Sequence, residues 1–149
     1  MPKQKRQISG DEGEKEVIKK VPCPNCKKDL MPLPNNYPLV DVQCTACHFR
    51  AQVKTRKSKP EKVIQGAGWD ILNKTLKAGY MIPPIFVNFQ WENSQEIRFY
   101  PFIPKANIRH SKREIKLKNG KIREYEMFNY INMDNLKHFV VYQKNDGKV

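Results

Sequence analysis

The sequence lacks any apolar run close to the length of about eighteen residues that a membrane-spanning helix needs. Its N-terminus, MPKQKRQISGDEGEKE, also lacks the apolar core of a signal peptide. Acidic residues are scarce, since 15 Asp and Glu stand against 28 Lys and Arg, which gives a net charge of +13 and a pI near 9.7. These shortages argue against a membrane protein, a secreted protein and a neutral enzyme of small metabolites. We expect a soluble cytoplasmic protein that binds a polyanion and no membrane.

The length limits the domain organisation. A chain of 149 residues is large enough for one hydrophobic core but not for two. Residues 1–12 are polar and basic and show no periodic apolar pattern, so they are predicted to form a flexible basic arm. Residues 13–149 are predicted to form a single domain, which opens with a short helix over residues 13–20 that Pro22 stops.

The pattern of apolar residues predicts a mixture of helices and strands. Residues 66–79 carry apolar side chains at helical spacing, with Trp69 on the side that packs against a sheet. Asn119 followed by Gly120 indicates a two-residue hairpin turn. Strands are predicted over residues 39–43, 49–55, 85–90, 97–103 and 139–142. This alternation predicts an α/β fold.

Cysteine is also rare, and its few positions are informative. Cys23, Cys26, Cys44 and Cys47 form the pattern C-x2-C-x17-C-x2-C. Each C-x2-C turn supplies two thiolates, and two such turns fill the tetrahedral shell of zinc (Zn2+). The alternative is four buried free thiols. Because zinc with four thiolate ligands has no open position for water, we expect a structural metal. We expect surface or packed positions for the three histidines, which are His48, His110 and His138.

Three polar residues flank the second cysteine pair. On a strand, Gln52 and Lys54 project to the same side while Val53 points away, and Asp41 lies on the preceding strand. A carboxylate that holds a divalent cation beside an ammonium group suits the hydrolysis of phosphodiesters. The alternative interpretation of these three residues is a charged, exposed strand face.

The order Asp41-x10-Gln52-Val53-Lys54 resembles the D-x(n)-(E/Q)-x-K core of the PD-(D/E)xK nuclease superfamily. With the cysteine pairs around it, it is similar to the Dpn-type methyl-directed restriction endonucleases and the related Dam-replacing proteins. The similarity continues, from about Val21 to Val149, through VPCPNC, VDVQCTACHFRAQVK, GAGWDILNKTLKAG, PPIFVNFQW, FYPFIPKANI and FNYINMDNLKHFVVYQKNDGKV. It implies a restriction-endonuclease-like mixed central sheet flanked by helices, with a four-cysteine zinc knuckle inserted in the catalytic hairpin.

The resemblance also implies roles for the polar residues. Asp41 and Gln52 fall where the family binds its catalytic Mg2+, and Val53, between Gln52 and Lys54, is a further candidate to bind it. Lys54 falls where a lysine assists the attack of water. The chain departs from the Dpn-type pattern because Gln52 stands where those enzymes carry a glutamate. Glu14 is the candidate to supply the missing carboxylate to Mg2+, with Glu16 as the alternative.

The activity implied is Mg2+-dependent type II restriction of adenine-methylated double-stranded DNA at a GATC-like site. Cutting both strands would need a homodimer or the transient pairing of two chains. The alternatives are a non-catalytic zinc-ribbon protein derived from such a nuclease and, ranked last, a zinc ribbon of the ribosome or a polymerase.

The characterised members of the family that this chain resembles look to have a C-terminal winged-helix domain after the nuclease domain. We do not expect that domain within this sequence. Basic residues, expected to contact phosphate, gather over residues 50–62 and 105–123.

Overall fold

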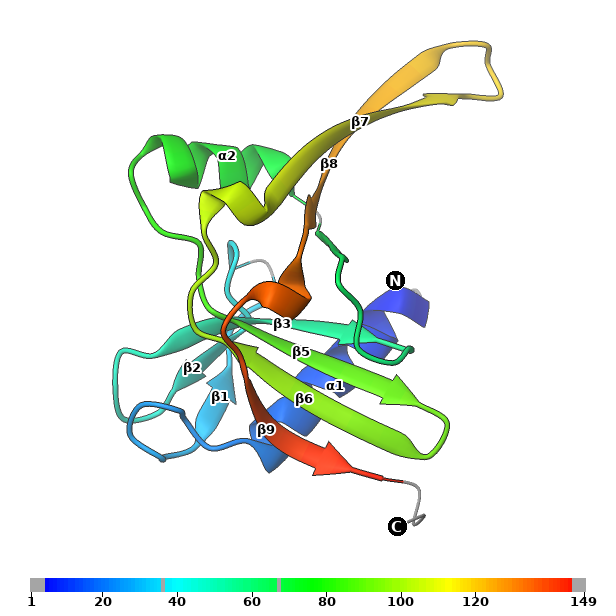
Figure 1. The fold of residues 1–149 in the computed structure, drawn as a ribbon. Helices are drawn as coiled ribbons and strands as arrows, with labels where there is room; N and C mark the ends of the chain where they lie inside the picture. Colours follow the sequence, from blue (N-terminus) through cyan, green and yellow to red (C-terminus); the bar gives the residue numbers. More distant parts are fainter. Residues whose placement is uncertain (1–4, 36, 67, 146–149) are drawn as a thin grey trace. The chain divides into compact units, whose positions relative to one another are not determined.

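The computed structural model describes residues 5–35, 37–66 and 68–145. The chain divides into two compact units (Figure 1). Unit 1 consists of Met1–Pro60, Pro83–Phe102 and Lys137–Val149, and unit 2 consists of Glu61–Ile82 and Ile103–Leu136. Unit 2 is therefore built from two segments that interrupt unit 1 in the sequence. Whether residues 13–149 fold as a single domain stays a prediction.

Unit 1 is a six-stranded mixed sheet with one helix. Its strands follow the order β1-β2-β3-β5-β6-β9, in which β3 and β5 are parallel and every other neighbouring pair is antiparallel. The elements are α1 (Lys5–Lys20), β1 (Leu30–Pro32), β2 (Val42–Cys44), β3 (Arg50–Arg56), β5 (Ile85–Trp91), β6 (Ser94–Tyr100) and β9 (Phe139–Lys144). The predicted α/β class with a mixed central sheet is confirmed.

Helix α1 packs on the sheet through its C-terminal half. Val17 is fully buried and shares one core with Val53 of β3, Phe86 of β5 and Ile97 of β6. Burying one such side chain contributes about 1.5–3 kcal/mol. Close to Gly13, the helix approaches β3 so tightly that a Cβ atom there would meet the side chain of Thr55 at 1.8 Å.

The first helix begins earlier than the sequence predicts. We expected its start at Gly13, after a flexible arm over residues 1–12, but α1 is helical from Lys5 onward. Once the packed turns around Val17 have formed, each further residue adds a hydrogen bond without a new nucleation cost, so polar residues can extend the helix. The prediction of an arm is wrong from Lys5 on, and residues 1–4 lie outside the described part of the chain.

Unit 2 is a three-stranded antiparallel sheet, β4-β8-β7, with one helix. Its elements are β4 (Ile64–Gly66), α2 (Trp69–Lys77), the 3-10 turn η1 (Lys105–Asn107), β7 (Ile108–Lys116), β8 (Ile122–Tyr130) and the 3-10 turn η2 (Met133–Asn135). The hairpin predicted at Asn119 and Gly120 is present, but its turn is longer than the two residues predicted. The N–H of Leu117 donates to the carbonyl of Lys121 at 2.8 Å, so Lys118 also belongs to the turn, and Gly120 lies in the left-handed region at φ 82°. No helix in the described residues is long and apolar enough to cross a membrane.

Two strand boundaries differ from the prediction for reasons of backbone geometry. Leu39 adopts φ 62°, which is not extended, so β2 starts at Val42 rather than at Leu39. Glu92 adopts φ 51° in a tight turn, and Ser94 pairs directly with Trp91, so β6 runs over Ser94–Tyr100 instead of residues 97–103.

Candidate functional site

The four cysteines lie together at one end of unit 1. Cys23 and Cys26 follow α1, Cys44 ends β2, and Cys47 lies in the turn to β3. The Sγ atoms of Cys23 and Cys47 are 3.6 Å apart, those of Cys26 and Cys44 are 3.3 Å apart, and all four lie within 4.8 Å of one another. Tetrahedral zinc with bonds of about 2.3 Å would separate its sulfurs by about 3.8 Å. The four cysteines could therefore hold one metal ion.

The surroundings favour the thiolate at Cys47 but not at Cys26, where a backbone hydrogen bond from Lys28 lowers the pKa but the neighbouring cysteines and burial raise it overall to about 12. The backbone N–H of Ala46 donates to the Sγ of Cys44 at 3.3 Å, and the side chain of Asn25 donates to the Sγ of Cys47 at 3.5 Å. The Asn25 bond is the main cause that lowers the pKa of Cys47 to about 6. Such donors to ligand sulfur are typical of metal-binding turns, in which the supporting groups orient the ligands. His48 is exposed and stands outside the group of four.

Asp41 is fixed where β2 and β3 separate. Its backbone N–H donates to the carbonyl of Ala51 at 2.9 Å, and its carbonyl accepts the N–H of Leu33 at 2.9 Å. Its carboxylate Oδ2 accepts the backbone N–H of Val53 at 2.8 Å. Two hydrogen bonds thus fix the backbone of Asp41, and the third, from Val53, orients its carboxylate.

Strand β3 divides its residues between two faces, as the alternation predicts. Val53 lies in the core beneath α1, while Gln52 and Lys54 project to the opposite face. Gln52 is 3% exposed, and its Nε2 donates to the carbonyl of Pro83 at 3.1 Å. The backbone of the segment before β5 therefore anchors the Gln52 amide.

Lys54 lies in the electrostatic field of two carboxylates. Burial lowers the pKa of Lys54, the charges of Asp41 and Glu14 oppose this effect, and Arg56 adds to it. The net pKa is lower than the ordinary value of 10.5. A lysine whose pKa is lowered by burial, beside two carboxylates, is typical of functional sites.

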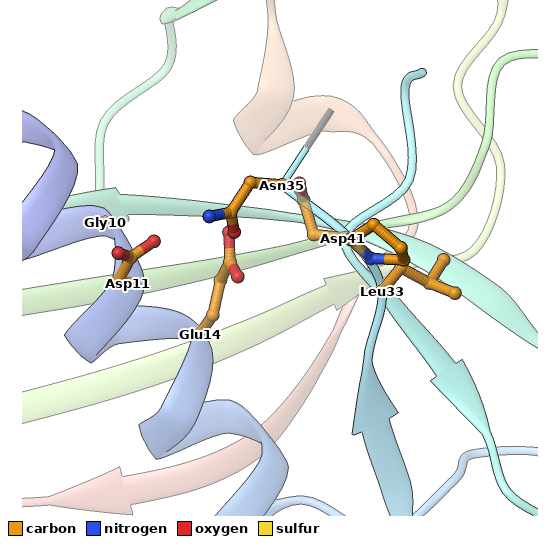
Figure 2. A pocket seen from close by; sticks show the side chains of 7 residues that line it. Gly10, Asp11, Glu14, Leu33, Asn35 and Asp41 are labelled. Carbon is orange, nitrogen blue, oxygen red and sulfur yellow. The ribbon is translucent and has the colours of Figure 1, made fainter. Parts of the chain in front are cut away.

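Asp41 and Glu14 line one pocket of about 430 Å³. Figure 2 shows Asp11 and Glu14 projecting from α1 on one side, with Asn35 and Asp41 on the other. Asp11 and Asn35 were not predicted from the sequence as part of this site. Asp11 could have been found from its spacing of three residues from Glu14, which places both on one helix face, if the helix had been predicted to start before Gly13.

Glu16, the alternative to Glu14, is engaged elsewhere. It forms an ion pair with Lys20 at 3.2 Å and accepts hydrogen bonds from Gln90 and Gln95 on the sheet. Burial raises the pKa of Glu16, but these bonds outweigh it and the pKa is lowered overall. Glu16 therefore holds α1 to β5 and β6, and Glu14 is the residue that shares a pocket with Asp41.

The carboxylates do not form a tight cluster. Among the described residues, the four cysteines are the only group of three or more His, Cys, Asp or Glu side chains close enough to hold one ion. Any cation at Asp41 would therefore depend on fewer carboxylates, supplemented by neutral oxygen ligands such as the amide of Gln52 or a backbone carbonyl.

In unit 2, Trp69 is only partly buried. Its ring stacks on His110, with the centroids 4.1 Å apart and an angle of 10°, and the centroid of Phe128 lies 6.2 Å away. The prediction that Trp69 packs against a sheet is confirmed, but its ring also supports the exposed His110 of β7.

The comparison with protein families gives one match. The family model described as DpnI, Dam-replacing family, matches residues 3–145, which is nearly the whole chain. No curated protein matches the sequence. The family match covers both units and all the residues discussed above.

Proposed function

Because this chain belongs to the Dam-replacing family, we propose that it is an Mg2+-dependent endonuclease that hydrolyses phosphodiester bonds of double-stranded DNA at Asp41, Gln52 and Lys54. The observation that supports this most strongly is local. Asp41 and Glu14 line one pocket, and both carboxylates act on the pKa of Lys54. A charged, exposed strand face would not bury its lysine in this way.

The residues present fit a hard divalent cation. Asp41 and Glu14, which line one pocket, offer carboxylate oxygens, the ligand type that Mg2+ prefers. Gln52 is not among the residues that line this pocket, and we propose its amide oxygen as a neutral ligand from β3. The N–H of Val53 points to Asp41, and because the N–H and C=O of one strand residue face the same side, its carbonyl is a further ligand candidate. When bound, Mg2+ would supply polarisation of the phosphate and a water of lowered pKa.

The chain's own residues would orient and activate the nucleophile. Asp41 is held rigidly by Val53, so it needs no rearrangement before the reaction. Because the pKa of Lys54 is lowered, a larger fraction of its side chain is the neutral amine than for a lysine in water at the same pH. Lys54 is therefore suited to accept the proton of the attacking water. Its ammonium form would then stabilise the charge on the phosphate.

The finer substrate preference comes from the family. We propose type II restriction of adenine-methylated DNA at a GATC-like site, with two chains pairing to cut both strands. We propose that the cysteine cluster holds structural zinc, since four thiolates leave no open position on the ion. A reducing cytoplasm would keep these cysteines available as thiols.

A second candidate is a non-catalytic DNA-binding protein derived from such a nuclease. It is favoured by Gln52, which replaces a negative charge with a neutral amide, and by the lack of a carboxylate cluster among the described residues. Both candidates use the same fold and the same cysteines. They differ only in whether the cation is held tightly enough at Asp41.

The test is incubation of the purified protein and Mg2+ with adenine-methylated and unmethylated plasmid. Asp41→Asn serves as the control because it preserves the size of the side chain. Discrete cleavage of methylated plasmid by the wild type alone would support the proposal. Cleavage of both plasmids would support a nuclease without methyl preference, and DNA binding without cleavage would support the second candidate.

A further inference from the structure

The β7–β8 ribbon has two chemically different faces. The strands pair over their whole length, from Ile108 opposite Tyr130 to Lys116 opposite Ile122, so alternate residues share a face. All three acids of these strands, Glu114, Glu124 and Glu126, lie on one face, which we call the acid face. All three arginines, Arg109, Arg113 and Arg123, lie on the other, which we call the arginine face.

The acid face is neutralised and partly covered. Lys112 lies 3.4 Å from Glu124 and 3.8 Å from Glu126, and His110 lies 3.5 Å from Glu126. At the base of the ribbon, Trp69 of α2 stacks on His110 of this same face. Two of the three basic residues of the acid face, His110 and Lys112, are therefore engaged with acids of the ribbon itself.

The arginine face has an unbalanced positive charge. Within the two nine-residue strands, which are fully described, it carries no acid, and its three arginines are exposed. The guanidinium of Arg123 lies over the ring of Tyr125, 5.1 Å from the centroid, which steadies it on the surface. The ribbon extends well beyond α2 in Figure 1, so this face is open along most of its length.

The dimensions of the ribbon suit a DNA groove. Nine residues of strand span about 30 Å, close to the rise of about 34 Å of one turn of B-DNA. The major groove, about 12 Å wide, admits a two-stranded ribbon. Guanidinium groups bind both phosphate and the edge of guanine with two hydrogen bonds, so arginines rather than lysines on this face favour a nucleic acid over a diffuse anion.

We propose that the arginine face of the β7–β8 ribbon is a DNA-reading surface that lies in the major groove of duplex DNA. The inference rests on the proposed function only in taking double-stranded DNA as the substrate. It assigns binding energy to Arg113 and Arg123 in particular, because both are exposed on the part of the ribbon nearer the turn.

The test compares two double variants that each remove two positive charges. Arg113→Ala with Arg123→Ala changes the arginine face, and Lys112→Ala with Lys116→Ala changes the acid face. Binding to a fluorescent adenine-methylated GATC duplex is measured by anisotropy over a series of KCl concentrations without Mg2+. We expect the arginine-face variant to bind the duplex at least about tenfold more weakly than the wild type. The slope of the logarithm of its binding constant against the logarithm of the KCl concentration should be less steep by about two. Both changes should be much smaller in the acid-face variant.

Two further measurements keep the outcomes separate. Circular dichroism checks that each variant is folded, and Arg113→Lys with Arg123→Lys retains the charge while removing the planar guanidinium. Equal losses in both double variants, or no loss in either, would overturn the assignment of the arginine face. If the wild type cleaves DNA in that case, the proposed function stands without this inference, whereas a wild type that binds no duplex would remove the proposed function itself.

Discussion

Two replacements of Asp41 separate its structural contribution from its chemical one. Its Oδ2 accepts the N–H of Val53 at 2.8 Å in a partly buried position. Asp41→Asn keeps an oxygen for this hydrogen bond but removes the negative charge, whereas Asp41→Ala removes both. Both variants should therefore lose cleavage, whereas their losses of folding stability should differ.

The expected magnitudes follow from this contact. Asp41→Ala leaves the N–H of Val53 without its acceptor, which costs about 1–3 kcal/mol of the free energy of unfolding. For a chain of this size, about 2–4 °C of Tm corresponds to each kcal/mol, so Tm should fall by about 2–12 °C. Asp41→Asn should lower the free energy of unfolding by about 1 kcal/mol or less, because a neutral acceptor replaces a charged one in the hydrogen bond from Val53. Both variants should cleave at least about 1000-fold more slowly, which corresponds to about 4 kcal/mol in the barrier.

The assays are single-turnover cleavage of adenine-methylated duplex with Mg2+ and thermal unfolding followed by circular dichroism. Asp29→Asn is the matched control, because it removes the same charge from an exposed position outside the pocket. Cleavage by Asp41→Asn at the rate of the wild type would refute the catalytic role assigned to Asp41. An equal loss of Tm in the Asn and Ala variants would refute the view that the hydrogen bond to Val53 needs only an oxygen acceptor.

Three further predictions concern the other site residues. Gln52→Glu replaces the amide that donates to Pro83, so it should lower Tm without Mg2+ and show a larger Mg2+-induced rise in Tm than the wild type; equal rises would remove Gln52 from the cation site. Cys44→Ser should abolish zinc binding and lower Tm, as elemental analysis and thermal unfolding would report, whereas retained stoichiometric zinc would contradict the four-thiolate site. Lys54→Met should abolish cleavage yet stabilise the fold. Because the pKa of Lys54 in the fold lies below 10.5, the unfolded chain binds its proton more tightly, so wild-type stability should rise with pH up to that value; urea unfolding should show this rise in the wild type and not in Lys54→Met.

Local patterns were enough to predict the parts of the site that lie close in sequence. The spacing of the cysteines predicted a cluster that the structure brings within 4.8 Å. The alternation along β3 correctly placed Gln52 and Lys54 on one face and Val53 in the core. In each case, the geometry of a turn or a strand fixes the arrangement without help from distant residues.

The rest depends on packing between segments far apart in the chain. The pocket at Asp41 needs α1 to lie against the β1–β2 loop, and no local signal predicts which turn of the helix arrives there. Gln52 meets the carbonyl of Pro83, 31 positions away. The choice between Glu14 and Glu16 likewise follows from the direction in which α1 crosses the sheet, because Glu16 contacts Gln90 and Gln95 there.

The order of pairing in unit 1 has a consequence for how the chain folds. Strand β6 pairs with β9 at a large sequence separation, as in the bond from Gln143 to Glu96, 47 positions away. Contacts of such high contact order form slowly, because the intervening loop must close first. Until β9 arrives, the edge of β6 exposes unpaired backbone groups beside Ile97 and Phe99. During synthesis, β9 emerges after the five other strands of this sheet, so the edge of β6 stays open to aggregation until β9 pairs with it.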